Sequence, residues 1–269
     1  MLSSERMIKR RYLWDQVQKD LTKKMVFVGG PRQVGKTTFA QSLAPKSKTA
    51  YLNWDVDTHR TLILKKELPP RNLIVFDELH KNKKWRGYLK GLYDSMKAEE
   101  IQTRQILVTG SARLDYYRFG GDSLQGRYHY LRLLPFSFHE LKASSQKDLK
   151  SLMTLGGFPE PFLGGSEKDA QRWSNEYMAR LVRDELTDLE FVSDIGTLEV
   201  LARALPSHVG SPLSINNLRE NLQVAHETVS KWIMMLERLY LIFRLTPFTG
   251  NLIKSIKKEQ KLYFFNWTF

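Results

Sequence analysis

Gly30-Pro-Arg-Gln-Val-Gly35-Lys36-Thr37 is the stretch that decides the fold of this 269-residue chain. It follows the apolar run Met25–Val28, which we expect to be a strand, and it leads into Val34–Leu43, which has helical spacing. A glycine-bounded loop between a strand and a helix, with lysine and a hydroxyl residue at its end, is typical of a phosphate-binding P-loop. The sequence therefore predicts a nucleotide site at the start of this helix.

Each residue type in the loop has an expected role in holding a phosphate chain. Gly30 and Gly35 let backbone N–H groups close around the β-phosphate, at the positive end of the following helix. Lys36 would contact the β- and γ-phosphates, and the Thr37 hydroxyl would bind Mg²⁺. The residues expected to line the nucleotide are Gly30, Pro31, Arg32, Gln33, Val34, Gly35, Lys36, Thr37 and Thr38. A glycine turn with an incidental lysine is the alternative interpretation.

An acidic pair ends the apolar run Leu73-Ile-Val-Phe-Asp77-Glu78. Unpaired buried carboxylates are costly, so such a pair has few structural reasons to end a buried strand. Beside a P-loop, Asp77 would hold Mg²⁺, and Glu78 would orient or deprotonate the attacking water. A glutamate directly after the aspartate favours ATP hydrolysis over phosphoryl transfer to a small molecule. The alternative is a solvated acidic strand end.

Two later segments carry candidates for contacts with the γ-phosphate. The strand that ends in Thr109-Gly110-Ser111 is expected beside the strand of Asp77, and either hydroxyl can act as a phosphate sensor. We prefer Ser111, although a glycine turn with a serine helix cap explains the pattern equally well. Arg127 precedes the expected strand Tyr128–Leu134 and can reach the γ-phosphate of a neighbouring subunit as an arginine finger. An ordinary surface arginine is the alternative for Arg127.

Apolar strands alternate with helices up to about residue 135, which predicts an α/β fold with a parallel sheet covered on both faces. Residues 136–193 have helical spacing, interrupted at Gly156–Pro161 by what we expect to be a rigid loop. Residues 194–269 predict short helices followed by two aromatic strands. We therefore expect a P-loop core at 1–135, a helical lid region at 136–193 and an incomplete winged-helix-like domain at 194–269.

The last region has the spacing of a helix-turn-helix. Ser214 can cap one helix, and a longer helix is expected over His226–Tyr240, with one apolar face. That apolar face consists of Val229, Trp232, Ile233, Leu236 and Leu239. The second helix is a candidate recognition element for DNA, and the strands beyond it would form the wing. A module that only packs or binds protein is the competing interpretation.

Composition bounds the class of protein and its partners. The formal net charge of +13 favours contact with a polyanion, of which nucleic acid is the commonest large one. The chain has no cysteine, which excludes disulfides and thiolate metal sites. Its apolar runs are too short to span a membrane, and no secretory signal is visible, so the cytoplasm is the default location. Expected partners are ATP, DNA, and a second copy of the chain or another protein.

These motifs together resemble the AAA+ ATPases, in particular a bacterial and archaeal group of predicted ATPases with a C-terminal region of unknown function. Besides the P-loop, the matching stretches are Tyr51-Leu-Asn-Trp-Asp55, Phe76-Asp-Glu-Leu-His-Lys81, Val108-Thr-Gly-Ser-Ala112, Gly126-Arg127, Leu134-Pro-Phe-Ser-Phe-His-Glu140, Gly156-Gly-Phe-Pro-Glu160 and Leu213–Pro247. The resemblance covers nearly the whole chain in the expected order. It implies a nucleotide-binding core, a small helical region and a winged-helix-like segment.

The chain also departs from that group in two ways. The resemblance implies a chain that continues well past Lys261–Phe265, often into a nuclease-like module, so this chain is expected to be a short form. No second sensor arginine can be assigned. Three functions remain: an ATPase that drives or switches a conformational change, a nucleotide-dependent DNA- or protein-binding module with negligible turnover, and a small-molecule kinase, which the pair Asp77-Glu78 disfavours.

Overall fold

The computed structural model describes residues 10–98, 104–111, 114, 124–185, 194–248 and 258–269. The chain forms two compact units. Unit 1 consists of residues 1–134 and 139–141, and unit 2 consists of residues 135–138 and 142–269. The sequence also predicts a short helix over residues 112–119, of which the structure describes only Leu114. The expected domain boundaries at 135 and 193 stay predictions.

A parallel sheet forms the centre of unit 1 and contains, among the described residues, five strands in the order β2-β3-β4-β1-β5. The strands are β1 (Met25–Gly29), β2 (Thr49–Asn53), β3 (Leu73–Asp77), β4 (Gln105–Thr109) and β5 (Tyr128–Arg132). Every residue of β1 and β3 is buried, which is why these strands are apolar without alternation. The predicted fold class, a P-loop α/β sheet, is confirmed.

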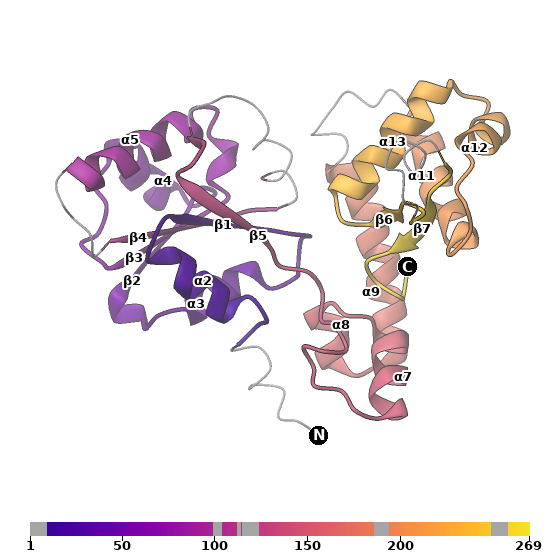
Figure 1. Cartoon of the computed structure of the whole chain (residues 1–269), viewed down its shortest axis with the longest axis horizontal. Helices are drawn as coiled ribbons and strands as arrows, with labels where there is room; N and C mark the ends of the chain where they lie inside the picture. The colour runs from indigo at the N-terminus through magenta and orange to yellow at the C-terminus, as the bar shows by residue number, and fades with distance from the viewer. Residues whose placement is uncertain (1–9, 99–103, 112–113, 115–123, 186–193, 249–257) are drawn as a thin grey trace. The chain divides into compact units, whose positions relative to one another are not determined.

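Helices cover both faces of this sheet: α2 and α3 lie on one face, and α4 and α5 lie on the other (Figure 1). Their bounds are α2 (Trp14–Leu21), α3 (Lys36–Ser42), α4 (Asp57–Lys65) and α5 (Trp85–Ala98), with short 3-10 turns η1 (Lys46–Lys48) and η2 (Leu79–Lys81). The sequence did not predict α2. This helix buries Val17 and Leu21.

Strand register brings the predicted motifs to one edge of the sheet. Asp77 at the end of β3 pairs with Thr109 at the end of β4, and β1 lies between β4 and β5. Because the carboxyl ends of parallel strands meet at the same edge, the loop after β1 opens beside Asp77 and Thr109. Arg127 immediately precedes β5 and therefore lies at the opposite edge.

Unit 2 is mainly helical. Its elements are α7 (Gln146–Leu155), α8 (Pro159–Gly164), α9 (Glu167–Arg180), the π-helical turn η4 (Leu181–Glu185), α11 (Ile195–Ala204), the 3-10 turn η5 (Leu205–His208), α12 (Ile215–Leu222), α13 (His226–Arg238), β6 (Ile242–Leu245) and β7 (Lys261–Phe264). Strands β6 and β7 pair antiparallel. The five apolar residues expected on one face of this helix are all buried, although α13 ends at Arg238, one residue before Leu239.

One prediction for unit 2 was wrong. The segment expected to be a rigid loop contains a helix, because α8 begins at Pro159. Proline is favoured in the first turn of a helix, where its missing N–H group would have no partner, so Pro159 and Pro161 initiate this helix instead of preventing it. Gly156, which has a φ of 76°, ends α7 just before it.

The residues from Asn266 to Phe269 pack into unit 2. Asn266 is 1% exposed, and its Oδ1 accepts a hydrogen bond of 2.7 Å from the Gly157 N–H group. Its Nδ2 donates to Thr268 Oγ1 at 2.6 Å. The Phe269 ring stacks on Tyr177, with centroids 5.4 Å apart. These contacts join the end of the chain to the glycine pair between α7 and α8.

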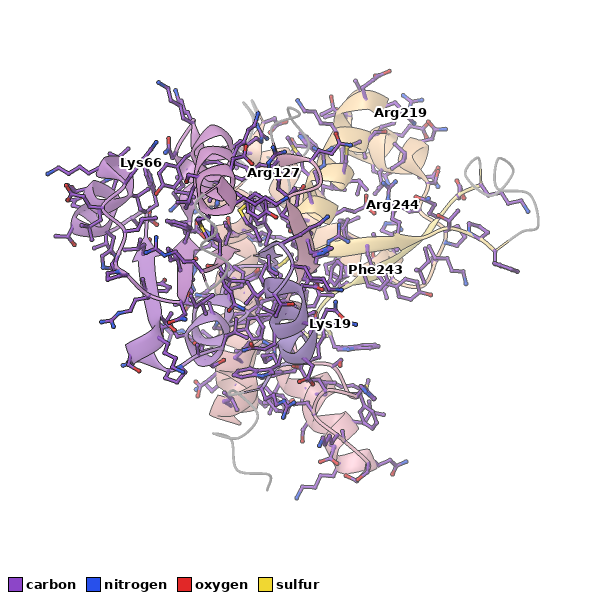
Figure 2. The ribbon with its side chains drawn as sticks, turned by 60° about the vertical axis from the view of Figure 1, so that its left-hand side comes forward. Lys19, Lys66, Arg127, Arg219, Phe243 and Arg244 are labelled. Carbon is purple, nitrogen blue, oxygen red and sulfur yellow. The ribbon has the colours of Figure 1, made fainter. Side chains whose placement is uncertain are left out.

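Charged side chains lie on the surfaces of both units, as Lys19 and Lys66 in unit 1 and Arg219 in unit 2 illustrate (Figure 2). Within the described part of the chain, none of the helices has the length and apolar character needed to cross a membrane.

Candidate functional site

The loop between β1 and α3 has a conformation that depends on its glycines. Gly30 has a φ of 148°, and a Cβ atom added there would lie 2.2 Å from the Leu133 carbonyl oxygen. Gly35 has a φ of 90° and occupies the N-cap of α3. Both positions lie in the region that favours glycine, and Gly30 also faces backbone that cannot move aside. The glycines predicted from the motif are therefore required by geometry.

The other predicted loop residues divide by exposure. Gly30, Pro31, Val34 and Lys36 are buried, whereas Arg32 and Gln33 in the loop and Thr37 and Thr38 in α3 are exposed. Gln33 also has a positive φ, 60°, which is uncommon for a residue with a side chain. The two threonines lie in the first turn of α3, and the Thr37 hydroxyl also donates to Asp77.

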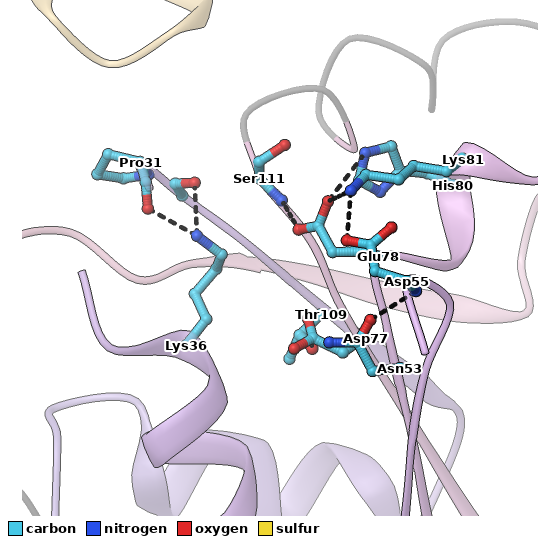
Figure 3. A network of polar contacts seen from close by, with 11 residues as sticks. Pro31, Lys36, Asn53, Asp55, Asp77, Glu78, His80, Lys81, Thr109 and Ser111 are labelled. Carbon is cyan, nitrogen blue, oxygen red and sulfur yellow. Dashed lines mark hydrogen bonds and ion pairs between the residues drawn. The ribbon is translucent and has the colours of Figure 1, made fainter. Parts of the chain in front are cut away.

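Lys36 is the first residue of α3, and its side chain folds back over the loop (Figure 3). The Nζ atom donates to the Pro31 carbonyl at 2.6 Å and to the Gly30 carbonyl at 3.1 Å, and the residue is 8% exposed. A buried ammonium group needs such acceptors. Phosphate oxygens bound in the loop would take the place of these carbonyls.

Asp77 connects the loop to the sheet. The residue is 5% exposed, and its Oδ2 accepts a hydrogen bond of 3.0 Å from Thr37 Oγ1. Its Oδ1 accepts a hydrogen bond of 2.7 Å from Thr109 Oγ1. The two residues predicted to hold a metal, Thr37 and Asp77, are thus brought together. A hydroxyl and a carboxylate are oxygen ligands of the kind that Mg²⁺ prefers, and phosphate and water would complete its shell.

Tyr51 is a member of the site that the sequence did not predict. Tyr51 lies on β2, and its hydroxyl donates to Asp77 Oδ2 on the neighbouring strand β3, where the register pairs Asn53 with Asp77. Burial raises the pKa of the Tyr51 hydroxyl, and the hydrogen bond to the Asp77 carboxylate raises it further. The hydroxyl therefore stays protonated and acts as a donor to Asp77. Only the pairing of β2 with β3 could have indicated this contact.

Glu78 has an uncommon backbone conformation for a non-glycine residue, with a φ of 56°. Its Oε1 accepts a hydrogen bond of 3.0 Å from the Ser111 backbone N–H group (Figure 3). Its Oε2 lies 3.5 Å from Lys81 Nζ and 3.7 Å from His80 Nε2. Lys81 Nζ also lies 2.5 Å from Asp55 Oδ2. The carboxylate is held between β4 and the turn η2, an arrangement that the sequence did not predict.

The two candidate sensor hydroxyls have different surroundings. Thr109 is fully buried, and its hydroxyl is committed to Asp77. Ser111 is 2% exposed, and its Oγ has no hydrogen-bond partner among the described residues. A buried hydroxyl without a partner is costly unless something binds it. The preference for Ser111 as the sensor stays a prediction.

Arg127 forms a bidentate pair with Asp94 on α5. Its Nε donates to Asp94 Oδ1 at 2.9 Å, and its Nη2 donates to Asp94 Oδ2 at 3.2 Å. The guanidinium group lowers the pKa of the Asp94 carboxyl through this hydrogen bond. Arg127 directly precedes β5, and the strand carries the chain about 16 Å from Arg127 to Arg132, beside the loop, at roughly 3.3 Å per residue. It therefore does not reach the nucleotide site of its own chain, and its role as a finger for a neighbouring subunit stays a prediction.

Family models match both halves of the chain. Residues 22–142 match a model described as an AAA domain, and residues 146–267 match a domain of unknown function (DUF8612).

Two curated mycobacterial proteins are similar along most of the chain. They are the uncharacterized proteins Mb2031c of Mycobacterium bovis and Rv2008c of Mycobacterium tuberculosis, each 24% identical over 242 residues. The match covers 89% of this chain and 53% of each relative, so the chain spans about half the length of the curated relatives it matches.

Solved structures also match, at low similarity. A RuvB variant from Thermotoga maritima is 19% identical with a TM-score of 0.39, and the match covers 94% of this chain and 99% of that one. AMPPCP-bound DnaA from Aquifex aeolicus is 14% identical with a TM-score of 0.42, and the match covers 84% of this chain and 86% of that one. The ORC1 protein of Aeropyrum pernix, in complex with DNA, is 14% identical with a TM-score of 0.37, and the match covers 98% of this chain and 89% of that one.

Proposed function

We propose that unit 1 binds ATP together with Mg²⁺ and hydrolyses it, which the match of residues 22–142 to an AAA domain model supports. The observation that carries this proposal is the hydrogen bond of 3.0 Å between Thr37 Oγ1, in the P-loop, and Asp77 Oδ2, at the end of β3. It joins the two oxygen ligands that a nucleotide-bound magnesium ion requires from the protein. The bound ion would neutralise charge on the β- and γ-phosphates.

The chain's own residues account for the remaining requirements of hydrolysis. Lys36 would exchange the carbonyls of Gly30 and Pro31 for phosphate oxygens and place its positive charge against them. Glu78 would accept the proton of the attacking water, since its carboxylate lies beside the end of β4. The buried hydroxyl of Ser111 would donate to the γ-phosphate. The products are ADP and inorganic phosphate, with the proton passing through Glu78 to solvent.

The test is release of inorganic phosphate from ATP by the purified chain, with Mg²⁺ and with EDTA, alongside ATP binding measured by calorimetry. We expect release that requires Mg²⁺. Binding without release above the EDTA background would favour the alternative function, a nucleotide-dependent DNA- or protein-binding module with negligible turnover. If the chain does not bind ATP at all, both proposals fail.

Tyr51→Phe is expected to raise the Mg²⁺ concentration needed for half-maximal phosphate release by about tenfold, the effect of losing one hydrogen bond to a charged group. The phenylalanine ring fills the same space, but Asp77 loses the hydroxyl that holds Oδ2. The measurement is a Mg²⁺ titration of phosphate release at saturating ATP. Tyr88→Phe is the matched control, because the Tyr88 hydroxyl is buried without a hydrogen-bond partner among the described residues. Equal half-maximal Mg²⁺ concentrations for both variants would show that Tyr51 does not support Asp77.

A second proposal concerns unit 2, which we infer to carry a winged-helix-like module that binds DNA. Helices α12 and α13 are followed by the antiparallel pair β6–β7, in the order of such a module. The observation that favours DNA is the exposure of Lys258 and Lys261 on the hairpin and of Arg219 on α12. The sequence has two more lysines close by, Lys254 and Lys257, which lie outside the described residues.

DNA binding by this module should weaken steeply as salt rises, because phosphate contacts release counterions. We expect Lys258→Ala/Lys261→Ala to lower the slope of log affinity against log salt by about 2 relative to the unmodified chain. Fluorescence anisotropy of a labelled duplex at several salt concentrations measures the slope. The control is Lys147→Ala/Lys150→Ala, which removes two exposed lysines from α7. A shared slope for the two double variants would exclude the hairpin from the interface.

A further inference from the structure

Arg11 and Glu140 form an ion pair in the interior of unit 1, although they are 129 residues apart in the sequence. Their side chains are only 3% and 7% exposed. Arg11 Nε donates to Glu140 Oε1 at 2.6 Å, and Arg11 Nη2 donates to Oε2 at 3.2 Å. Removing two charges from water is expensive, so a buried pair is by itself weak evidence of stabilisation. The role of this pair therefore depends on the other groups to which the two side chains are hydrogen-bonded.

The remaining donors of Arg11 bind two backbone carbonyls. Nη1 donates to the Val34 carbonyl at 2.9 Å, and Nη2 donates to the Leu134 carbonyl at 2.6 Å. Val34 belongs to the phosphate-binding loop, and Leu134 lies two residues beyond the end of β5. The planar guanidinium group offers five donors in a fixed geometry, so one side chain can bind a carboxylate and both carbonyls at once.

Tyr12 completes the arrangement around Glu140. Its backbone N–H group donates to Glu140 Oε1 at 2.9 Å. Its hydroxyl donates to the Arg132 carbonyl and accepts a hydrogen bond of 3.1 Å from the Leu134 N–H group. The polar groups of the pair are therefore satisfied, as a buried ion pair requires. The chain enters unit 1 again only at residues 139–141 after leaving it at residue 135, and Glu140 lies in that short return.

We propose that Arg11 is a positioning residue for the phosphate-binding loop, an inference that rests on the proposed function of unit 1. The Val34–Gly35 peptide group is planar and trans, as are all peptide bonds of the described residues, so its C=O and N–H groups point in opposite directions. Arg11 binds the Val34 carbonyl on the buried side of the loop. The Gly35 N–H group is thereby directed to the other side, toward the site of the phosphates.

The conformation of Gly35 explains why a hydrogen bond to the Val34 carbonyl matters. Glycine rotates more freely than any other residue, and Gly35 adopts a φ of 90° at the N-cap of α3. Without a partner for the Val34 carbonyl, the preceding peptide plane could turn and take its N–H group out of the phosphate site. Holding the carbonyl before nucleotide arrives lowers the ordering cost of binding. Arg11 therefore raises nucleotide affinity without touching nucleotide.

The variant that separates this role from a purely structural one is Arg11→Lys. Lysine keeps the positive charge against Glu140, but a single ammonium group cannot bind the carboxylate and the carbonyls of Val34 and Leu134 in the fork geometry of arginine. We expect a folded protein whose dissociation constants for Mg²⁺-ATP and ADP both rise about tenfold, the effect of one charged hydrogen bond. Calorimetry well below the melting temperature of each variant measures binding to folded protein only.

The neighbouring arginine provides the matched control. Arg10 is 66% exposed and pairs at the surface with Asp15, so Arg10→Lys should bind both nucleotides as the unmodified chain does. A second variant, Arg11→Gln/Glu140→Gln, removes both buried charges together and leaves no carboxylate unpaired. It is expected to lose affinity as Arg11→Lys does, because neither amide reproduces the contact with Val34.

Each outcome decides the proposal. Weaker binding of both nucleotides by folded Arg11→Lys, with Arg10→Lys unchanged, supports it. Unchanged affinity in a folded Arg11 variant overturns it, and so does the failure of both Arg11 variants to fold, since the pair would then serve the fold alone. An unmodified chain that binds no ATP refutes the proposed function instead. The readout is binding, so absence of turnover does not affect the result.

Discussion

Glu78→Gln is expected to lower the rate of phosphate release from ATP by about a hundredfold or more, the usual contribution of a general base. The amide that replaces the carboxylate has nearly the same shape, but it cannot accept a proton from water. Its oxygen can still accept the hydrogen bond of 3.0 Å from the Ser111 N–H group, so the fold of the site should persist. ATP affinity, measured by calorimetry, should change little because Glu78 acts on the water and not on the nucleotide.

The matched control for this variant is Glu67→Gln, which replaces an exposed glutamate just beyond α4. It should hydrolyse ATP at the unmodified rate. Phosphate release by Glu78→Gln equal to that of the unmodified chain at saturating ATP would exclude Glu78 as the base. In that event the pair Asp77-Glu78 would retain only the metal role of Asp77.

Lys36→Met has the second large expected effect, a rise in the dissociation constant for Mg²⁺-ATP of about a hundredfold or more. Methionine resembles the lysine stem in length and tolerates the buried position, but it offers no positive charge to the phosphates. The ammonium group would make charged hydrogen bonds to phosphate oxygens, each contributing roughly 1.5–3 kcal/mol. Two such bonds together correspond to about a hundredfold or more in affinity.

The Lys36→Met variant can also lose stability. In the chain without nucleotide, Lys36 Nζ donates to the carbonyls of Gly30 and Pro31, so losing the ammonium group removes two hydrogen bonds from the loop. The melting temperature must therefore be measured together with the calorimetric titration of ATP. Lys46→Met, at an exposed position after α3, is the control. ATP bound by folded Lys36→Met as tightly as by Lys46→Met would mean that the loop does not hold the phosphates as proposed.

The sequence was a good guide to the core of the fold, and its failures there were local. The buried strands β1 and β3 have no polar residue until Asp77, so their apolar runs stand out from the loops around them. Helix α2 was missed because it follows a basic segment and buries few apolar residues. Helix α8 was missed because prolines that begin a helix cannot be told from prolines of a loop without the backbone course.

In the candidate site, too, the sequence predicts the residues of local motifs but not the contacts between distant segments. Lys36, Thr37 and the pair Asp77-Glu78 belong to short motifs whose residue types and spacing state their chemistry, so they could be found in the sequence. The contact of Tyr51 with Asp77 joins residues 26 apart on neighbouring strands. It depends on the strand order, which no local pattern contains. The same holds for the position of Lys81 beside Glu78, which needs the turn η2.

By itself, then, the sequence determined the glycine-bounded loop, the acidic pair and the alternation that makes a parallel sheet. Those features arise from residue type and spacing along the chain, and their physics is local. Only the tertiary structure decided that Arg11 binds the Val34 carbonyl and Glu140, and that Arg127 pairs with Asp94. Arginine can bind any carboxylate or carbonyl within reach, so its partner is fixed by which distant segments the folded sheet brings beside it.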